Sequence, residues 1–207
     1  MKHTLLTVSL LSAAASLSAQ AAGATKLSYD SIRLGYVQSE EIKGIGISGS
    51  ALLGEHVLIG GSYQDLSART LDDVDGEANS VSLGVRFGAG SGDIIIGGSY
   101  GQLQGAGIDG ATAIVLAANV TSFDIAYRHA FSSSFEGLVS YSRVRTEVAA
   151  GAYDFDTGAA AIGSASSSDN VFGLAVRYNL SSAVDVTLGY SWIDSDGSWS
   201  LSAGYNF

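Results

Sequence analysis

The sequence predicts an all-β fold, a transmembrane antiparallel up-and-down β-barrel, and three observations support this. Only 14% of the 207 residues are charged, against roughly 25% in an ordinary soluble domain. Beyond the first 21 residues, no apolar run reaches the roughly 18 residues of a membrane-spanning helix. Polar and apolar residues instead alternate along repeated segments, as they do in barrel strands. A closed barrel is the other structure that pairs its own backbone groups in lipid.

The N-terminal segment 1–21 has the pattern of a cleaved secretory signal peptide. Lys2 and His3 form a short polar start, residues 5–17 are mostly apolar, and 19–21 read Ala-Gln-Ala, a small-x-small cleavage pattern. The apolar part is too short, and too interrupted by serine, for a membrane anchor. The mature chain is therefore expected to be one barrel domain, residues 22–207.

Overall composition excludes several kinds of partner and chemistry. The net charge is −10 and the pI about 4.5, whereas nucleic-acid binders present clustered Lys and Arg. There is no cysteine, so disulfides and thiolate metal sites are ruled out. There are 27 glycines and no proline, a composition compatible with uninterrupted, closely packed strands.

Alternation is clearest in two consecutive segments. Val81, Leu83, Val85 and Phe87 alternate with small or polar residues, and segment 93–103 follows the same plan. The stretch GGSYQDL at 60–66 recurs as GGSYGQL at 97–103, which indicates a duplicated hairpin.

Counting such segments predicts ten strands, with eight as the alternative. Their expected ranges are 28–38, 44–53, 56–66, 79–88, 93–103, 120–131, 134–147, 170–180, 184–194 and 198–207. Short connections then alternate with long ones at 67–79, 104–119 and 148–169, as periplasmic turns alternate with extracellular loops.

Aromatic residues should form two girdles, one at each membrane interface. The outer girdle is expected at Tyr36, Tyr63, Tyr100, Tyr141 and Trp192, and the inner one at Phe87, Tyr127, Tyr178 and Tyr205.

The last strand ends at an aromatic residue, Phe207. Its apolar face carries Tyr205 two residues earlier. This ending resembles the C-terminal signal by which outer-membrane barrels are recognised for assembly, although Ser202 stands where glycine is usual. The chain resembles the small single-domain Gram-negative outer-membrane barrels of the OmpA-like transmembrane or porin-like type. The resemblance implies residence in the cell outer membrane. It also implies contact with lipid and lipopolysaccharide, and recognition by the barrel-assembly machinery through Tyr205 and Phe207.

The face opposite the apolar one should line the lumen, and it is made of small groups. It carries Gly46, Ser48, Ser50, Gly60, Ser62, Gln64, Ser80, Ser82, Gly84, Gly97, Ser99, Ser140, Ser142, Gly173, Ala175, Thr187, Gly189, Ser200 and Ser202. Such groups cannot fill the middle of a barrel, so the lumen should hold water or an infolded loop.

Three Arg–carboxylate combinations flank short turns. Arg86, Arg128 and Arg177 end three strands, and Asp93, Glu136 and Asp185 follow them at a distance of seven or eight residues. Each combination shares one strand face and can pair across its hairpin. The pairs either fasten the turns and fill the barrel floor or form a constriction that selects solutes; the fastening role is favoured. The first hairpin offers Ser50 and His56 instead.

No enzyme activity, cofactor or metal site is expected. The three histidines are His3, in the signal segment, and His56 and His129, both at predicted periplasmic turns, so no catalytic set can form at the outer rim. The acidic run of Asp72, Asp73, Asp75 and Glu77 does not complete a calcium loop and is better explained as solvated. Two functions remain: a narrow passive pore for small solutes, or a non-conducting structural or adhesive surface protein.

Overall fold

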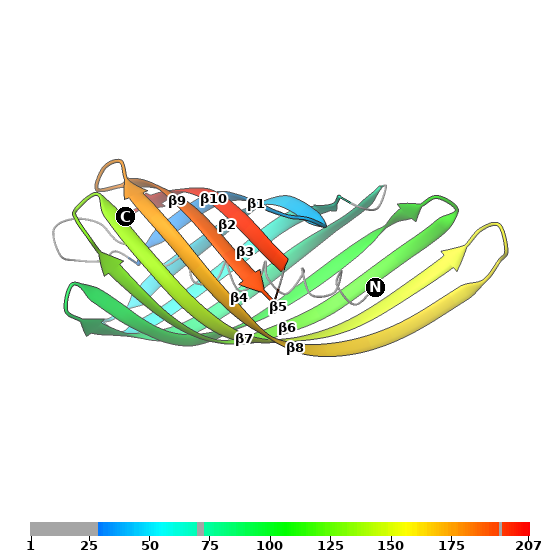
Figure 1. The fold of residues 1–207 in the computed structure, drawn as a ribbon, viewed down its shortest axis with the longest axis horizontal. Helices are drawn as coiled ribbons and strands as arrows, with labels where there is room; N and C mark the ends of the chain where they lie inside the picture. Colours follow the sequence, from blue (N-terminus) through cyan, green and yellow to red (C-terminus); the bar gives the residue numbers. More distant parts are fainter. Residues whose placement is uncertain (1–28, 70–72, 195) are drawn as a thin grey trace.

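The computed structural model describes residues 29–69, 73–194 and 196–207, and these form one closed antiparallel β-barrel of ten strands (Figure 1). The predicted fold class and strand count are confirmed. The signal-peptide prediction for 1–21 lies outside the described residues. The strands are β1 Ser31–Ser39, β2 Ile42–Leu53, β3 Val57–Ala68, β4 Val74–Ala89, β5 Gly92–Asp109, β6 Thr112–Ala130, β7 Phe135–Asp154, β8 Ala160–Asn179, β9 Val184–Ile193 and β10 Asp196–Asn206.

Each strand pairs with its sequence neighbours, and β1 pairs with β10 to close the barrel, in register from Ser31↔Asn206 to Ser39↔Ser198. The strand backbones therefore find their hydrogen-bond partners within the sheet, as a lipid environment demands. No helix long and apolar enough to cross a membrane occurs in the part of the chain that the structure describes.

The two ends of the barrel differ, and we call them the floor and the mouth. The floor is the end where β1 begins and β10 finishes, and there the Phe207 amide donates to the Asp30 carbonyl at 3.2 Å. Its turns lie at 54–56, 90–91, 131–134 and 180–183. Gly54 and Gly90 sit in the first two of these turns with φ of 66° each, a left-handed conformation that glycine adopts without steric cost.

The mouth departs from the sequence prediction, because two of the three expected long loops are strands. β5 and β6 are joined across Gly110 and Ala111 alone, and β7 and β8 across residues 155–159, so the loops expected at 104–119 and 148–169 were wrong. The third, 67–79, is shortened because β3 runs to Ala68 and β4 starts at Val74. These segments are rich in Gly, Ala and Ser, which is typical of loops, but an antiparallel ladder is held by backbone groups whatever the side chains.

The longer strands make the barrel wall uneven in height. β5 to β8 have 18 to 20 residues each, whereas β1, β9 and β10 have 9 to 11. In Figure 1 the β7–β8 hairpin, yellow, extends far past the short β10, red. The ladder between β8 and β9 extends only from Asn179 to Phe172 of β8, so segment 160–171 is bonded to β7 alone among the described strands.

Inward-facing residues form three layers. Small residues occupy the middle, where the structure places Ser48, Ser62, Ser140, Gly173, Gly189 and Ser200 around one cavity, as the sequence predicts. Toward the mouth lies a set of buried apolar side chains, which we call the apolar collar. It consists of Val37, Leu66, Leu103, Ala118, Val120, Val144, Val148, Val171 and Ile193. The floor is polar and charged, and it is described next.

Candidate functional site

The floor holds the three Arg–carboxylate pairs suggested by the sequence. Each pair joins the end of one strand to the start of the next across a floor turn: β4 to β5, β6 to β7, and β8 to β9. The pairs are Arg86 Nη1 to Asp93 Oδ2 at 2.8 Å, Arg128 Nη2 to Glu136 Oε2 at 2.5 Å, and Arg177 Nε to Asp185 Oδ1 at 3.3 Å. Five of these six residues are buried, and Arg86 is partly exposed.

A fourth arginine, Arg33 on β1, joins this cluster and was not identified from the sequence. Its Nη2 pairs with Asp185 on β9, across the intervening β10. Its Nη1 donates to Thr187 Oγ1 and Ser202 Oγ, each at 3.0 Å. Asp185 also accepts from Asn206 Nδ2 at 2.9 Å. A single carboxylate thus serves two guanidinium groups and the last strand.

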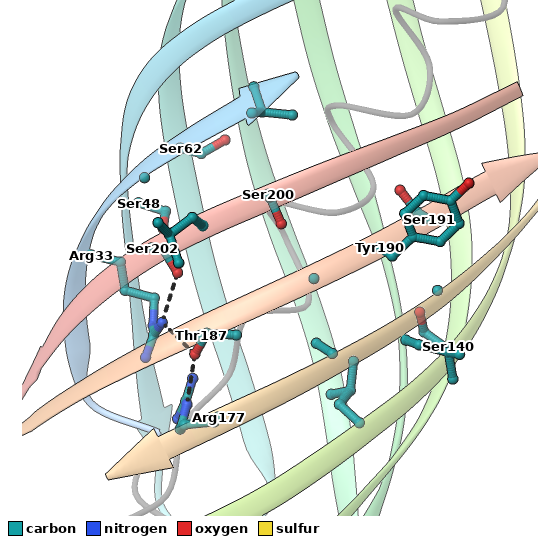
Figure 2. A pocket seen from close by; sticks show the side chains of 18 of the residues that line it. Arg33, Ser48, Ser62, Ser140, Arg177, Thr187, Tyr190, Ser191, Ser200 and Ser202 are labelled. Carbon is teal, nitrogen blue, oxygen red and sulfur yellow. Dashed lines mark hydrogen bonds between the residues drawn. The ribbon is translucent and has the colours of Figure 1, made fainter. Parts of the chain in front are cut away.

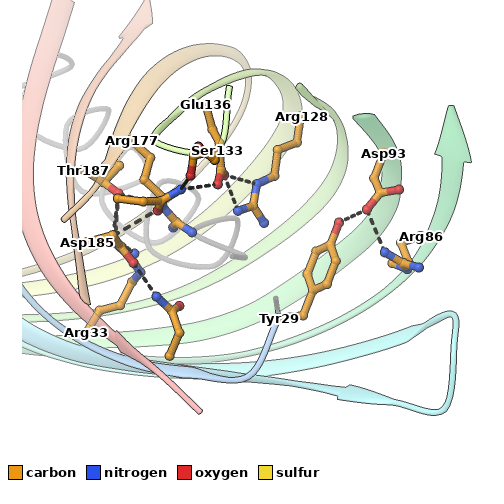
Figure 3. A network of polar contacts seen from close by, with 12 residues as sticks. Tyr29, Arg33, Arg86, Asp93, Arg128, Ser133, Glu136, Arg177, Asp185 and Thr187 are labelled. Atoms are coloured by element: carbon orange, nitrogen blue, oxygen red, sulfur yellow. Dashed lines mark hydrogen bonds and ion pairs between the residues drawn. The ribbon is translucent and has the colours of Figure 1, made fainter. Parts of the chain in front are cut away.

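Tyr29, just before β1, connects this cluster to the β4–β6 side of the floor. Its hydroxyl donates to Asp93, and its ring lies 5.1 Å from the Arg86 guanidinium carbon and 5.4 Å from that of Arg128, within cation–π range. The ring also belongs to a buried apolar cluster with Leu58 and Ile95. Figure 3 shows Tyr29 between Arg128 and the Arg86–Asp93 pair.

The first hairpin contributes differently from the others. Ser50 Oγ donates to the Tyr29 carbonyl oxygen at 2.9 Å, so it helps to hold the segment that carries the tyrosine. His56 Nδ1 lies 3.2 Å from the Arg86 carbonyl oxygen and is exposed. Neither residue replaces an ion pair.

Above the floor the lumen encloses a cavity of about 150 Å³. Arg33, Arg128 and Arg177 line its lower part, and serine and glycine from β2, β3, β7, β9 and β10 line its wall. Figure 2 shows Arg33 and Arg177 on either side of Thr187. Val37 and Val171 of the apolar collar mark its upper limit. A second hollow, of about 500 Å³, lies between the projecting parts of β5 to β8, against Leu103 and Val148.

His129 and Asp124 are not among the residues that line this cavity. His129 contacts the Tyr127 hydroxyl at 3.0 Å and packs against Phe131 with ring centroids 4.7 Å apart, beside a floor turn. Asp124 is buried and accepts from Ser122 Oγ at 2.6 Å. Within 29–69, 73–194 and 196–207, no group of three or more His, Cys, Asp or Glu side chains is placed to hold a metal ion.

The outer surface is apolar over its middle. Large side chains such as Leu34, Leu83 and Val81 are more than 60% exposed, which is unfavourable in water over so wide a band. In lipid the same surface is compatible with its surroundings.

Aromatic rings border the apolar band. Toward the mouth, contacts between neighbouring rings link Tyr36 with Trp199, Tyr190 with Trp192, and Phe172 with both Tyr141 and Trp192. Toward the floor the exposed rings are Phe87, Tyr127, Phe131, Phe135, Tyr178, Tyr205 and Phe207. Tyr205 and Phe207, the proposed assembly signal, thus point outward from the C-terminal end of the chain.

Comparison with known proteins yields similarity at the level of solved structures only. No protein-family model and no curated protein sequence matches the chain. Among solved structures, a KdgM porin shares 11% identity and a TM-score of 0.45, over 86% of this chain and 99% of that one. The translocator domain of autotransporter NalP from Neisseria meningitidis shares 14% identity and a TM-score of 0.39, over 86% and 87%. The N-terminal β-barrel domain of Pseudomonas aeruginosa OprF shares 12% and 0.36, over 86% and 96%. These similar structures are outer-membrane β-barrel proteins.

Proposed function

We propose that this protein is an integral outer-membrane β-barrel of structural or adhesive type, whose lumen is closed at rest. The floor faces the periplasm and the projecting hairpins face outward, so that both ends of the barrel domain lie on the side from which it inserts. Segment 1–21 directs export and is removed. The apolar band with its two aromatic borders supports the membrane placement.

The burial of the floor residues is the observation that supports a closed lumen. Arg33, Arg128, Glu136 and Asp185 are each at most 3% exposed, although all are charged and lie inside a barrel with a polar lumen. Together with Tyr29 they fill the space between strands on opposite sides. A permanently open pore would leave such side chains hydrated.

A narrow passive pore for small solutes is the second candidate. It is supported by the lining of the middle layer, where Ser48, Ser140 and Ser200 face a cavity. In that case the charged floor acts as the constriction that controls which solutes pass.

Planar-bilayer recording of the refolded protein separates the two candidates. We expect the wild type to insert without conductance steps. Tyr29→Ala should produce steps, because it removes the ring that bridges the two sides of the floor; Tyr153→Ala, on the projecting part of β7, is the matched control and should remain silent. Discrete steps from the wild type would overturn the closed state and favour the pore.

The partners proposed are outer-membrane lipid, lipopolysaccharide and the barrel-assembly machinery. Phe207→Ala should lower the amount of folded barrel that reaches the outer membrane in cells, while Phe155→Ala at the β7–β8 turn should not. Equal amounts of the two variants would contradict recognition through the terminal aromatic residue.

A further inference from the structure

The lower part of the lumen cavity contains hydrogen-bond donors that have no acceptor. Arg33 Nε, Arg128 Nη1 and Arg177 Nη1 are buried atoms without a hydrogen-bond partner. They belong to three guanidinium groups from β1, β6 and β8, and all three residues line the same cavity. A buried donor left without an acceptor costs free energy, more so when it is charged.

The neighbouring carboxylate oxygens accept from other groups, and none of them is bonded to the three unpartnered nitrogens. Glu136 Oε2 accepts from two nitrogens of Arg128, and Oε1 accepts from Asn179 Nδ2 at 2.8 Å. Asp185 Oδ1 accepts from Arg33 and pairs with Arg177, and its Oδ2 accepts from Asn206. All four carboxylate oxygens are therefore in use.

The charges around the cavity also indicate that an acceptor is missing. The guanidinium groups that line the cavity carry three positive charges, and the carboxylates that contact them, Glu136 and Asp185, carry two negative charges. Asp124, the next carboxylate along the inner face of β6, is not among the residues around this cavity. One additional negative charge would balance the site.

We propose that this pocket binds one small oxyanion, a carboxylate or a monovalent phosphate. Its oxygens would accept from Arg128 Nη1 and Arg177 Nη1, one nitrogen from each guanidinium group, so that two points of contact come from two arginines. The Ser202 hydroxyl accepts from Arg33 at 3.0 Å. Its own hydrogen therefore remains available for donation to the anion. The site requires the barrel but does not depend on whether the lumen conducts.

Titration calorimetry on the full mature chain in detergent, at low salt, tests this proposal. Phosphate and acetate, titrated separately, should show which oxyanion fits better, and we expect saturable binding of one anion per barrel for at least one of them. Chloride, which lacks the second acceptor atom, should bind at least about ten-fold more weakly.

A matched pair of variants assigns the binding to the floor. Arg128→Lys keeps the positive charge beside Glu136 but removes the unpartnered Nη1, so affinity should fall about ten-fold. Arg145→Lys, in an exposed pair with Glu147, should bind as the wild type does. Equal affinity in both variants, or no saturable binding by the wild type, would overturn the proposal.

A measurement on the wild type alone covers the case in which Arg128→Lys does not fold. The ¹⁵N resonances of the buried arginine Nε groups should shift on titration with the better oxyanion, because Arg33 Nε lies at the site. Resonances that stay unchanged at saturating oxyanion would contradict binding at the floor even if calorimetry detects heat.

Discussion

Arg33 and Asp185 form an ion pair that crosses β10, joining the first strand of the barrel to the ninth. The two residues are 152 positions apart in the sequence, and their side chains are 2% and 0% exposed. The same carboxylate pairs with Arg177, so Asp185 neutralises two arginines on this side of the floor.

Asp185→Asn should therefore be strongly destabilising. The amide keeps the shape but leaves two buried arginines without their counter-charge, a change that typically costs about 3–5 kcal/mol. The measurement is denaturant unfolding in lipid vesicles. Glu147→Gln, which breaks the exposed Arg145 pair, should cost at most about 1 kcal/mol. A similar loss of unfolding free energy in the two variants would show that the buried floor pairs stabilise the barrel no more than an exposed pair does.

A second prediction concerns the lipid-facing band. Leu83 points outward from β4 and is 63% exposed. Leu83→Arg should cost about 2–4 kcal/mol of unfolding free energy in lipid vesicles, as expected for a cation near the middle of the bilayer. Ile162, which is 92% exposed on the projecting part of β8, is the control, and Ile162→Arg should be nearly neutral. A neutral Leu83→Arg would mean that the membrane does not contact this part of β4.

A third prediction tests the close approach of β5 and β6 at the floor. A side chain on Gly92 would collide with the Arg128 carbonyl oxygen, a backbone atom in the β5–β6 ladder. Gly92→Ala should thus lower the unfolding free energy by about 1–3 kcal/mol, the usual cost of overpacking. Gly163, on β8, has open space around it, so Gly163→Ala should stay within about 0.5 kcal/mol of the wild type.

The fourth prediction is a pH dependence at the tip of the β7–β8 hairpin. The Asp154 carboxylate accepts from the backbone amides of Thr157 at 2.8 Å and Asp156 at 3.0 Å. These hydrogen bonds lower the pKa of Asp154, and the bond from Thr157 has the largest effect. A lowered pKa in the folded state means that the carboxylate stabilises the turn at pH values above its ordinary pKa, near 3.9. That contribution is lost as the pH falls through the lowered value.

Amide exchange at Thr157, followed by NMR at decreasing pH, measures this effect. After correction for the intrinsic rate, protection should decrease in acid for the wild type. In Asp154→Asn it should stay constant, since the amide oxygen accepts but does not titrate. A wild type whose protection is equally constant would contradict the carboxylate's role.

The sequence carried local information well. The three Arg–carboxylate pairs could be found because their members are separated only by a tight turn, and the strand count followed from side-chain alternation. The extended length of β5 to β8 could not be predicted in the same way. Their distal parts alternate little, and their pairing depends on the neighbouring strand rather than on their own residue types.

Arg33 and Tyr29 were missed for a related reason. Their partners, Asp185 and Asp93, are distant in sequence and come close only when the barrel closes. One signal was available: Arg33 alternates with the apolar Ile32 and Leu34, which places a cation on the inner face of β1 near the floor. Its partner could not be identified without the strand order.

The seam between β1 and β10 has a consequence for the order of folding. Every other ladder joins strands that are consecutive in the sequence, but this one pairs Ser31 with Asn206. The entropic cost of closing its loop is therefore the largest among the ten ladders. The local hairpins should form before this ladder does. Until it forms, the sheet has two open edges that can pair with another chain. Arg33 lies on β1 and Asp185 on β9, so their ion pair across β10 can form only when β1 pairs with β10. Once formed, the ion pair opposes separation of these two strands.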